Sequence, residues 1–252
     1  MLSNAQIKQI RSLHQNKYRR KLNRFLSEGT VNVLEFIHGP LPVIAIYATE
    51  SWIAKYSEEN KDLPIQPISA REMEKISALK NPSEVLAVIE KPEYSLPDLS
   101  STENFVLALD NIRDPGNLGT IIRTADWFGI PDVVCSHETV DAFNPKVVQA
   151  TMGSLARIRV HYTSLTQWLS SKPSDFPLWA AVLDGDDIRQ SQPPPKGILL
   201  IGSEAHGISP SLSPFFDKKI KIPSAPNRKT ESLNAAVATA ILCYALRLPF
   251  LK

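Results

Sequence analysis

Residues 105–129 have the sequence FVLALDNIRDPGNLGTIIRTADWFG, and this stretch decides the fold. The residues from Phe105 to Asp110 are mostly apolar, which predicts a buried strand. Asp114-Pro115-Gly116 is typical of a turn that leads into a helix. The helix ends at Gly129, and one of its faces carries the apolar residues Leu118, Ile121, Ile122, Ala125 and Phe128. A strand followed closely by a helix predicts a sheet covered by helices.

The same alternation continues towards the C-terminus. We expect strands at 132–136, 157–162, 178–183, 198–201 and 219–222. Helices are expected at 145–155, 165–169 and 232–248. Strands separated by helices predict an α/β fold with a mostly parallel sheet flanked on both faces. This C-terminal domain spans residues 104–252.

A smaller α/β unit precedes it and ends near residue 91. Strands are expected at 42–47 and 85–90, with helices at 31–37, 51–59 and 70–78. Ahead of them, Ile7, Ile10 and Leu13, and later Leu22, Phe25 and Leu26, give a helical stripe. Residues 92–103 contain two prolines among polar residues, which is typical of a linker.

Composition excludes several classes of protein. The 252 residues are 43% hydrophobic and 21% charged, which excludes a disordered or fibrous chain. No apolar run approaches the ~20 residues that cross a bilayer. The basic N-terminal segment lacks the apolar stretch of a signal peptide, so we expect no export. Cys135 and Cys243 are too few for a disulfide framework and favour the reducing cytoplasm. The five histidines show no metal-ligand spacing, so no metal is expected.

The net charge of +2 hides an asymmetry. Residues 1–27 hold seven of the 28 basic side chains and no acidic one, which leaves 21 basic against 26 acidic residues elsewhere. Such a basic segment can meet RNA phosphates; on charge alone, a solvated helix without a partner is an equal alternative. The candidate RNA-binding residues are Arg11, Lys17, Arg19, Arg20, Lys21 and Arg24.

Three segments carry candidate chemistry. The first holds Asn117 and Arg123, beyond the strand that ends at Asp110. In the second, Leu199-Leu200-Ile201 leads to Gly202-Ser203-Glu204-Ala205-His206-Gly207, where a glycine permits close approach of a ligand to the backbone. The third is Ile220-Lys221-Ile222-Pro223 followed by Ser232-Leu233-Asn234. Taken singly, each segment also fits helix caps and solvated turn charges.

In this order and spacing the three segments resemble the SpoU (TrmH) family of RNA ribose 2′-O-methyltransferases, of the knotted SPOUT class. The resemblance covers residues 104–252. Residues 1–91 are similar to the L30e-like RNA substrate-binding domain that often precedes it, through Arg20, Phe25-Leu26-Ser27-Glu28-Gly29 and Val85–Ile89. Residues 226–230 form a longer insert than the family usually has.

The resemblance implies a C-terminal trefoil knot and S-adenosylmethionine as the methyl donor. The matching cofactor-binding positions are Gly202, Ile222 and Leu233, with Leu200 and Ile201 before them. The matching catalytic positions are Arg123, Asn117, Glu204, Ser232 and Asn234. The family substrate is RNA, and the extra N-terminal domain favours ribosomal over transfer RNA by analogy.

The resemblance also implies a homodimer. The apolar face of the last helix consists of Leu233, Val237, Ile241, Tyr244 and Leu248. This face is then a candidate for the dimer interface, and burial in the core of its own chain is the alternative. Two other functions stay open. A dehydrogenase is disfavoured because residues 115–119 lack the Gly-x-Gly-x-x-Gly pattern. An inactive RNA-binding protein that retains the fold ranks lower, because chemically suitable residues fill the motif positions.

Overall fold

The computed structural model of the protein describes residues 1–56 and 63–250, and its chain forms two compact units. Unit 1 comprises Met1–Glu93 and Asp141–Arg157, and unit 2 comprises Tyr94–Val140 and Ile158–Lys252. The domain boundaries expected near residues 91 and 104 stay a prediction. Packing assigns to unit 1 a segment, Asp141–Arg157, that the sequence pattern placed in the C-terminal domain.

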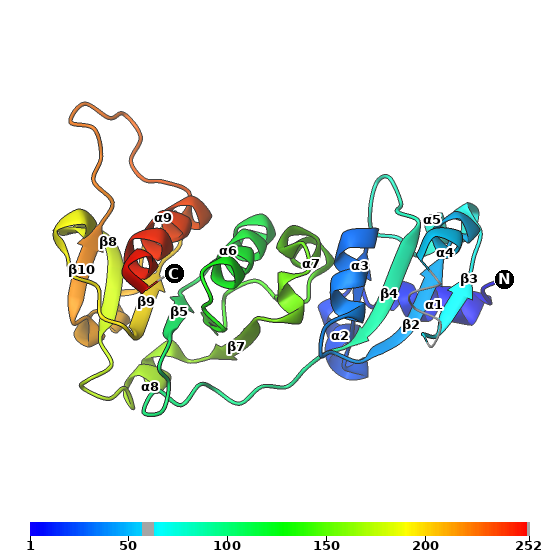
Figure 1. Cartoon of the computed structure of the whole chain (residues 1–252), viewed down its shortest axis with the longest axis horizontal. Coiled ribbons are helices and arrows are strands. Elements are labelled where there is room, and N and C mark those ends of the chain that lie inside the picture. The colour runs from blue at the N-terminus through cyan, green and yellow to red at the C-terminus, as the bar shows by residue number, and fades with distance from the viewer. Residues whose placement is uncertain (57–62, 251–252) are drawn as a thin grey trace. The chain divides into compact units, whose positions relative to one another are not determined.

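Unit 1 is a four-stranded sheet with helices (Figure 1). Its helices are α1 (Asn4–Ser12), α2 (Asn16–Leu22), α3 (Thr30–Ile37), α4 (Glu50–Tyr56), α5 (Ala70–Ile76) and α7 (Pro145–Thr151), with the short η2 (Ser154–Ala156). Its strands are β1 (Arg24–Glu28), β2 (Val43–Ala48), β3 (Ile65–Pro67) and β4 (Val85–Glu90). The strand order is β1-β4-β2-β3, in which β2 and β3 are parallel and β4 is antiparallel to both neighbours.

The N-terminal segment corrects one expectation. Phe25 and Leu26 do not continue a helix, because α2 ends at Leu22 and Asn23 adopts a left-handed conformation with φ 50°. The chain then enters β1, which pairs with β4 in the register Phe25↔Ile89. Both side chains are buried, so the apolar run reflects a strand in the core and not a helix face. Of the helix expected at 51–59, residues 57–59 lie outside the described part of the chain.

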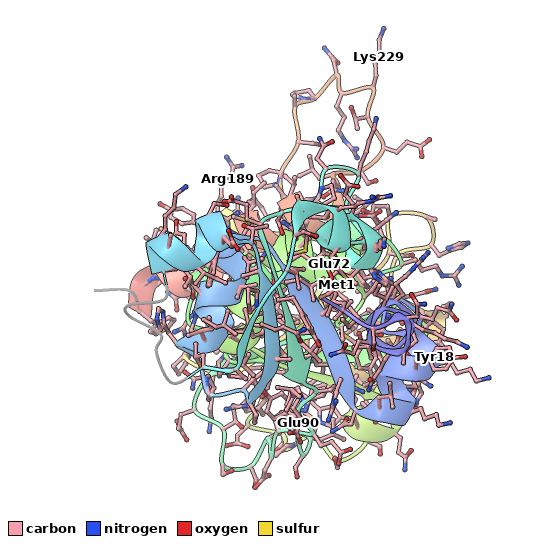
Figure 2. The ribbon with its side chains drawn as sticks, turned by 90° about the vertical axis from the view of Figure 1, so that its right-hand side faces the viewer. Met1, Tyr18, Glu72, Glu90, Arg189 and Lys229 are labelled. Atoms are coloured by element: carbon pink, nitrogen blue, oxygen red, sulfur yellow. The ribbon has the colours of Figure 1, made fainter. Side chains whose placement is uncertain are left out.

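Capping fixes the ends of two short helices in unit 1. Ser3 and Gln6 form a capping box at α1, and Ser69 and Glu72 form one at α5. The Glu72 carboxylate also accepts a hydrogen bond of 2.5 Å from the backbone N–H of Leu2. Figure 2 shows Met1 and Glu72 close together. The chain start is therefore tied to α5, and the backbone N–H groups of Ser69 and Leu2 hold the pKa of Glu72 at about 2.

The segment Asp141–Arg157 completes the core of unit 1. The Phe143 ring lies 4.8 Å from the Phe25 ring, and the buried Arg19 donates to the Asp141 carboxylate at 2.6 and 3.0 Å. Gly153 has φ 90°, and a Cβ there would stand 2.4 Å from the Glu35 side chain. The close approach and the backbone conformation both require glycine at this position.

Unit 2 is a six-stranded sheet with helices. Its strands are β5 (Phe105–Leu109), β6 (Asp132–Ser136), β7 (Arg159–Thr163), β8 (Leu178–Asp187), β9 (Gly197–Ile201) and β10 (Lys218–Lys221). Its helices are α6 (Pro115–Trp127), α8 (Leu165–Leu169), α9 (Ala235–Arg247) and the short η3 (Ile188–Gln190), η4 (Pro210–Phe215) and η5 (Leu248–Phe250).

The strand order in unit 2 is β10-β8-β9-β5-β6-β7, and each pairing is parallel. The chain runs from β5 to β7 in one direction and then returns to place β9 on the other side of β5. This reversal of direction makes β5 and β9 a topological switch point, where parallel sheets bind ligands beyond the carboxyl ends of their strands.

Helices flank the sheet, as expected for an α/β fold (Figure 1). Leu165, Trp168 and Leu169 of α8 pack in one core cluster with strand residues such as Ala108 and Leu200. The segment 222–234 leaves β10, extends away from the sheet and returns to α9 (Figure 1). The trefoil knot stays a prediction. Within residues 1–56 and 63–250, no helix is long and apolar enough to cross a membrane.

Candidate active site

The candidate site lies at the switch point. Leu109 at the end of β5 pairs with Ile201 at the end of β9, and the Asp110 N–H continues the ladder by donating to the Ile201 carbonyl at 2.8 Å. The segments that follow these two strands hold Asn117 and Glu204. The ends of adjacent parallel strands therefore bring together two segments that are 87 residues apart in the sequence.

Asn117 lies in the first turn of α6. The Asp114 side chain caps this helix by accepting from the Asn117 N–H at 2.8 Å, and Pro115 occupies the first helical position. Because the cap satisfies its backbone, the Asn117 side chain is free for other partners. Its amide donates to Glu204 Oε1 at 2.5 Å.

Asn234 joins the same cluster from the start of α9. Its Oδ1 caps that helix by accepting from the N–H groups of Ala236 and Val237 at 3.0 and 3.2 Å. Its Nδ2 donates to Asn117 Oδ1 at 2.8 Å and to Glu204 Oε1 at 3.2 Å. Asn234 is thus the N-cap of α9, so the helix expected at 232–248 begins only at Ala235 and Ser232 lies in the preceding loop.

Hydrogen bonds and helix dipoles stabilise the negative charge in the Asn117–Glu204–Asn234 cluster. Glu204 Oε1 accepts a third hydrogen bond, of 3.1 Å, from the Ala235 N–H. The carboxylate therefore lies at the N-terminal ends of α6 and α9, each 13 residues long, where helix dipoles stabilise negative charge. All three hydrogen bonds are made to Oε1. The arrangement makes Glu204 a clamp that fixes two amide side chains.

A tight loop carries Glu204. Ser203 and Gly207 exchange backbone hydrogen bonds of 3.1 and 2.9 Å, and Gly207 has φ 67°. A Cβ on Gly202 would stand 2.2 Å from the carbonyl carbon of Gly207, so the loop closes only over a glycine. The residues after β9 consequently fold back on the strand end.

Sequence reasoning gave no role to Asp110, which closes this loop. The residue is buried, and its carboxylate accepts from the Ser209 N–H at 2.7 Å. Its own N–H holds the Ile201 carbonyl, so Asp110 binds both ends of the loop 202–208. An acidic residue directly after an apolar strand was the available signal, because a buried carboxylate needs donors.

The other predicted catalytic residues do not join the cluster. Arg123 is exposed on α6, and in the described part of the chain it forms no ion pair. Ser232 is exposed in the loop before α9. Their proximity to a substrate stays a prediction.

The predicted cofactor positions fall into two groups. Gly202 and Ile222 lie on the loops beyond β9 and β10, and Leu233 lies on the loop before α9. Leu200 and Ile201 are buried within β9. Leu200 pairs with β5 and β8 on its two sides and packs in the core, so it supports the site and leaves no group for a ligand.

Unit 1 presents a basic surface on its first helices. Arg11, Lys17, Arg20 and Lys21 are exposed on or beside α1 and α2, and Arg24 is half-buried. Arg19 requires a correction, because its side chain is 3% exposed and its donors are taken by Asp141 and by the carbonyls of Leu13 and His14. It holds the unit together and is not available to RNA.

Comparisons with known proteins decide the family. The model of the SpoU rRNA Methylase family matches residues 104–244, which is more than half of the chain. The chain belongs to the SpoU rRNA methylase family. The model of the MRM3-like substrate binding domain matches residues 4–87 of this SpoU-family chain. The resemblance inferred from the three segments is confirmed.

Relatives and solved structures extend over the whole SpoU-family chain. A Bacillus subtilis protein named 23S rRNA (guanosine(2553)-2′-O)-methyltransferase RlmP is 32% identical, with 97% of this chain and 96% of that protein covered. A 23S rRNA (uridine(2479)-2′-O)-methyltransferase from Streptomyces viridochromogenes is 30% identical, covering 97% and 90%. A TrmH-family structure from Porphyromonas gingivalis has a TM-score of 0.89 at 35% identity, covering 99% of both chains. An AdoMet-bound rRNA methyltransferase from Sinorhizobium meliloti has a TM-score of 0.85 at 28% identity, covering 100% and 97%.

Proposed function

We propose that this SpoU-family chain transfers a methyl group from S-adenosylmethionine to a ribose 2′-hydroxyl of ribosomal RNA. The observation that carries the proposal is the convergence of Asn117, Glu204 and Asn234, from three separate segments, at the switch point of the sheet. The Bacillus and Streptomyces relatives are named for different nucleotides of 23S rRNA. The proposal therefore specifies ribosomal RNA and no nucleotide.

The residues at the sheet edge fit S-adenosylmethionine. An adenosine and an amino acid offer donors and acceptors that suit backbone recognition. Gly202, Ile222 and Leu233 lie on the loops after β9, after β10 and before α9, outside regular helices and strands. The close approach of Gly202 to the Gly207 backbone shapes the loop 202–208, and Asp110 fixes that loop at both ends. When bound, the cofactor supplies a methyl group on a sulfonium, which is already electrophilic.

The chain itself has to orient the ribose hydroxyl and assist the loss of its proton. Arg123 binds a phosphate of the RNA and polarises the 2′-hydroxyl, while the phosphate accepts the proton, because a guanidinium stays protonated. The Asn117 and Asn234 amides, fixed by Glu204, position the ribose, and Ser232 adds a hydroxyl from the loop. Preorganised amides of this kind cost no rearrangement during the reaction.

The basic side chains of unit 1 bind the RNA backbone. The exposed side chains of Arg11, Lys17, Arg20 and Lys21, with Arg24, bind phosphates in a sequence-independent way. Neither a metal nor a membrane enters the proposal, and in the part of the chain that the structure describes no cluster of His, Cys, Asp or Glu could hold a metal ion. The reaction belongs to the cytoplasm, where the free Cys135 and Cys243 stay reduced.

The active form is a homodimer built on α9. The five apolar residues considered for the interface are all exposed in this chain, at 38–54%, while Leu242, Cys243 and Leu246 of the same helix face the core. These exposed fractions favour the interface over the alternative for that face, burial in the chain's own core. Trp127 adds an 84% exposed ring at the end of α6. Apolar area of this kind favours pairing with a second copy.

The decisive experiment incubates the protein with radiolabelled S-adenosylmethionine and unmodified ribosomal RNA. Alkaline hydrolysis then cuts every linkage except the one beside a 2′-O-methyl group. We expect label in an alkali-resistant dinucleotide. Label on transfer RNA alone would contradict the choice of substrate, and binding of RNA without any transfer would indicate an inactive protein. Sedimentation of wild type and Tyr244→Glu tests the dimer, since only the variant should be monomeric.

A further inference from the structure

Arg113 is a second exposed arginine at the candidate site. It lies in the turn between β5 and α6, four residues before Asn117. Its Nε donates to Asn111 Oδ1 at 2.8 Å. Within residues 1–56 and 63–250 it forms no ion pair, so the guanidinium keeps its charge and its Nη groups for an external partner.

The backbone of Asn111 is what seats this arginine. Asn111 has φ 61°, in the left-handed region. The other non-glycine residues with positive φ in the described chain are Asn23 and Met152, and each ends a helix. Asn111 ends no helix, so its conformation has another cause. Left-handed backbone that is held in place by the surrounding structure is often found at functional positions.

Hydroxyl groups at the end of β6 hold the turn in this conformation. The Asn111 N–H donates to Ser136 Oγ at 3.0 Å, and the Ile112 N–H donates to Thr139 Oγ1 at 3.3 Å. The neighbouring carboxylates are engaged elsewhere: Asp110 accepts from Ser209 and Asp114 from Asn117. The Arg113 charge is thus positioned and not neutralised.

The sheet order separates Arg113 from the predicted cofactor positions. Gly202 and Ile222 follow β9 and β10, which lie on one side of β5. The Asn111–Arg113 turn is anchored to β6, on the other side of β5. Arg113 therefore lies on the side of β5 opposite to the loops that are predicted to hold the cofactor. Resting on the proposed function, we propose that Arg113, seated by Asn111, binds a phosphate of the RNA substrate close to the target nucleotide.

Salt-dependent RNA binding tests this directly. An unmodified ribosomal RNA transcript is titrated with the full chain at several salt concentrations. Arg113→Ala should weaken binding about tenfold, as expected for a lost charge-assisted hydrogen bond. The slope of log K against log salt should fall by about 0.7–0.9, the loss of one phosphate contact. Calorimetric affinity for S-adenosylmethionine should stay unchanged.

Two further variants separate positioning from charge. Asn111→Gly keeps the backbone conformation and removes Oδ1, so it should weaken RNA binding less than Arg113→Ala and add nothing in the double variant. Lys196→Ala is the matched control, because it also removes one positive charge. Lys196 lies just before β9, at the amino ends of the parallel strands, and its side chain pairs with Glu103 and Asp175. This variant should leave the slope unchanged.

Several results would overturn the inference. An unchanged slope for Arg113→Ala, or a loss of cofactor affinity with RNA binding intact, would refute the phosphate contact. A full additional loss from Asn111→Gly in the Arg113→Ala background would refute the seating role. These are binding measurements, so they stand apart from the proposed function, which fails instead if wild-type protein binds RNA and transfers no methyl group.

Discussion

Replacing Asp141 with alanine would show how much the free energy of unfolding falls when the buried Arg19 charge loses its ion pair. The Arg19 side chain is 3% exposed and the Asp141 side chain 19% exposed, with Nη2 and Oδ2 2.6 Å apart. The remaining partners of the guanidinium are two backbone carbonyls, of Leu13 and His14, at 3.0 and 2.9 Å. Asp141→Ala therefore leaves a buried cation with two of its four hydrogen bonds.

The size of the effect follows from that geometry. Removing one partner of a buried ion pair costs about 3–5 kcal/mol. The partial exposure of Asp141 favours the lower end, and the lost bond of 3.1 Å to the Phe143 N–H adds to the loss. We expect a decrease of about 3 kcal/mol in the free energy of unfolding, or ~6–12 °C in Tm for a chain of this length.

Urea denaturation, with hydrogen exchange of the α2 and α7 amides to locate the change, measures this loss. Glu35→Ala is the control, because its ion pair with Arg157 joins side chains that are 39% and 46% exposed, and it should cost no more than about 1 kcal/mol. The double variant Arg19→Met, Asp141→Leu should recover most of the loss. A decrease below about 1 kcal/mol for Asp141→Ala would refute the reasoning.

The remaining predictions concern the site and the capped helix. Glu204→Ala should lower the methylation rate about 100-fold by releasing the amides that it fixes, and Glu204→Gln, which keeps an acceptor oxygen, should lose less; equal rates would argue against the clamp. Arg123→Ala should abolish turnover with calorimetric cofactor affinity near normal. Gly202→Ala should weaken cofactor binding in the same calorimeter, because the added Cβ displaces the loop. The pKa of Glu72 is lowered from 4.5 to about 2. The ionised carboxylate therefore stabilises the folded protein fully above pH 4.5, and this stabilisation is lost as the pH falls through 2. The Tm difference between wild type and Glu72→Gln should shrink across that interval.

Local pattern predicted the elements that packing did not override. Apolar runs located β5, β6 and β9, and the Asp114-Pro115 turn located the start of α6. Phe25 and Leu26 were assigned wrongly, because a short apolar run has the same composition in a helix and in a buried strand, and only pairing with β4 decides between them.

The candidate site shows the same division. The sequence indicated Asn117, Glu204 and Asn234 as candidate site residues. It did not show that one carboxylate oxygen of Glu204 accepts hydrogen bonds from both amides. The sequence also left open which residue caps α9, and it wrongly predicted that Arg19 binds RNA. Burial and partners depend on contacts between distant segments, and residue type alone does not specify them.

The sequence by itself determined the alternation of strands and helices, the positions of the three chemical segments and the basic N-terminal helices, since each depends on neighbours along the chain. Tertiary structure alone decided which strands adjoin, so that β9 lies beside β5 and the helix ends of α6 and α9 meet at Glu204. It alone placed Asp141–Arg157 in unit 1 and turned Arg19 inward. The physical reason is that hydrogen bonds and charge burial act through space, between groups whose separation in sequence carries no information about their distance.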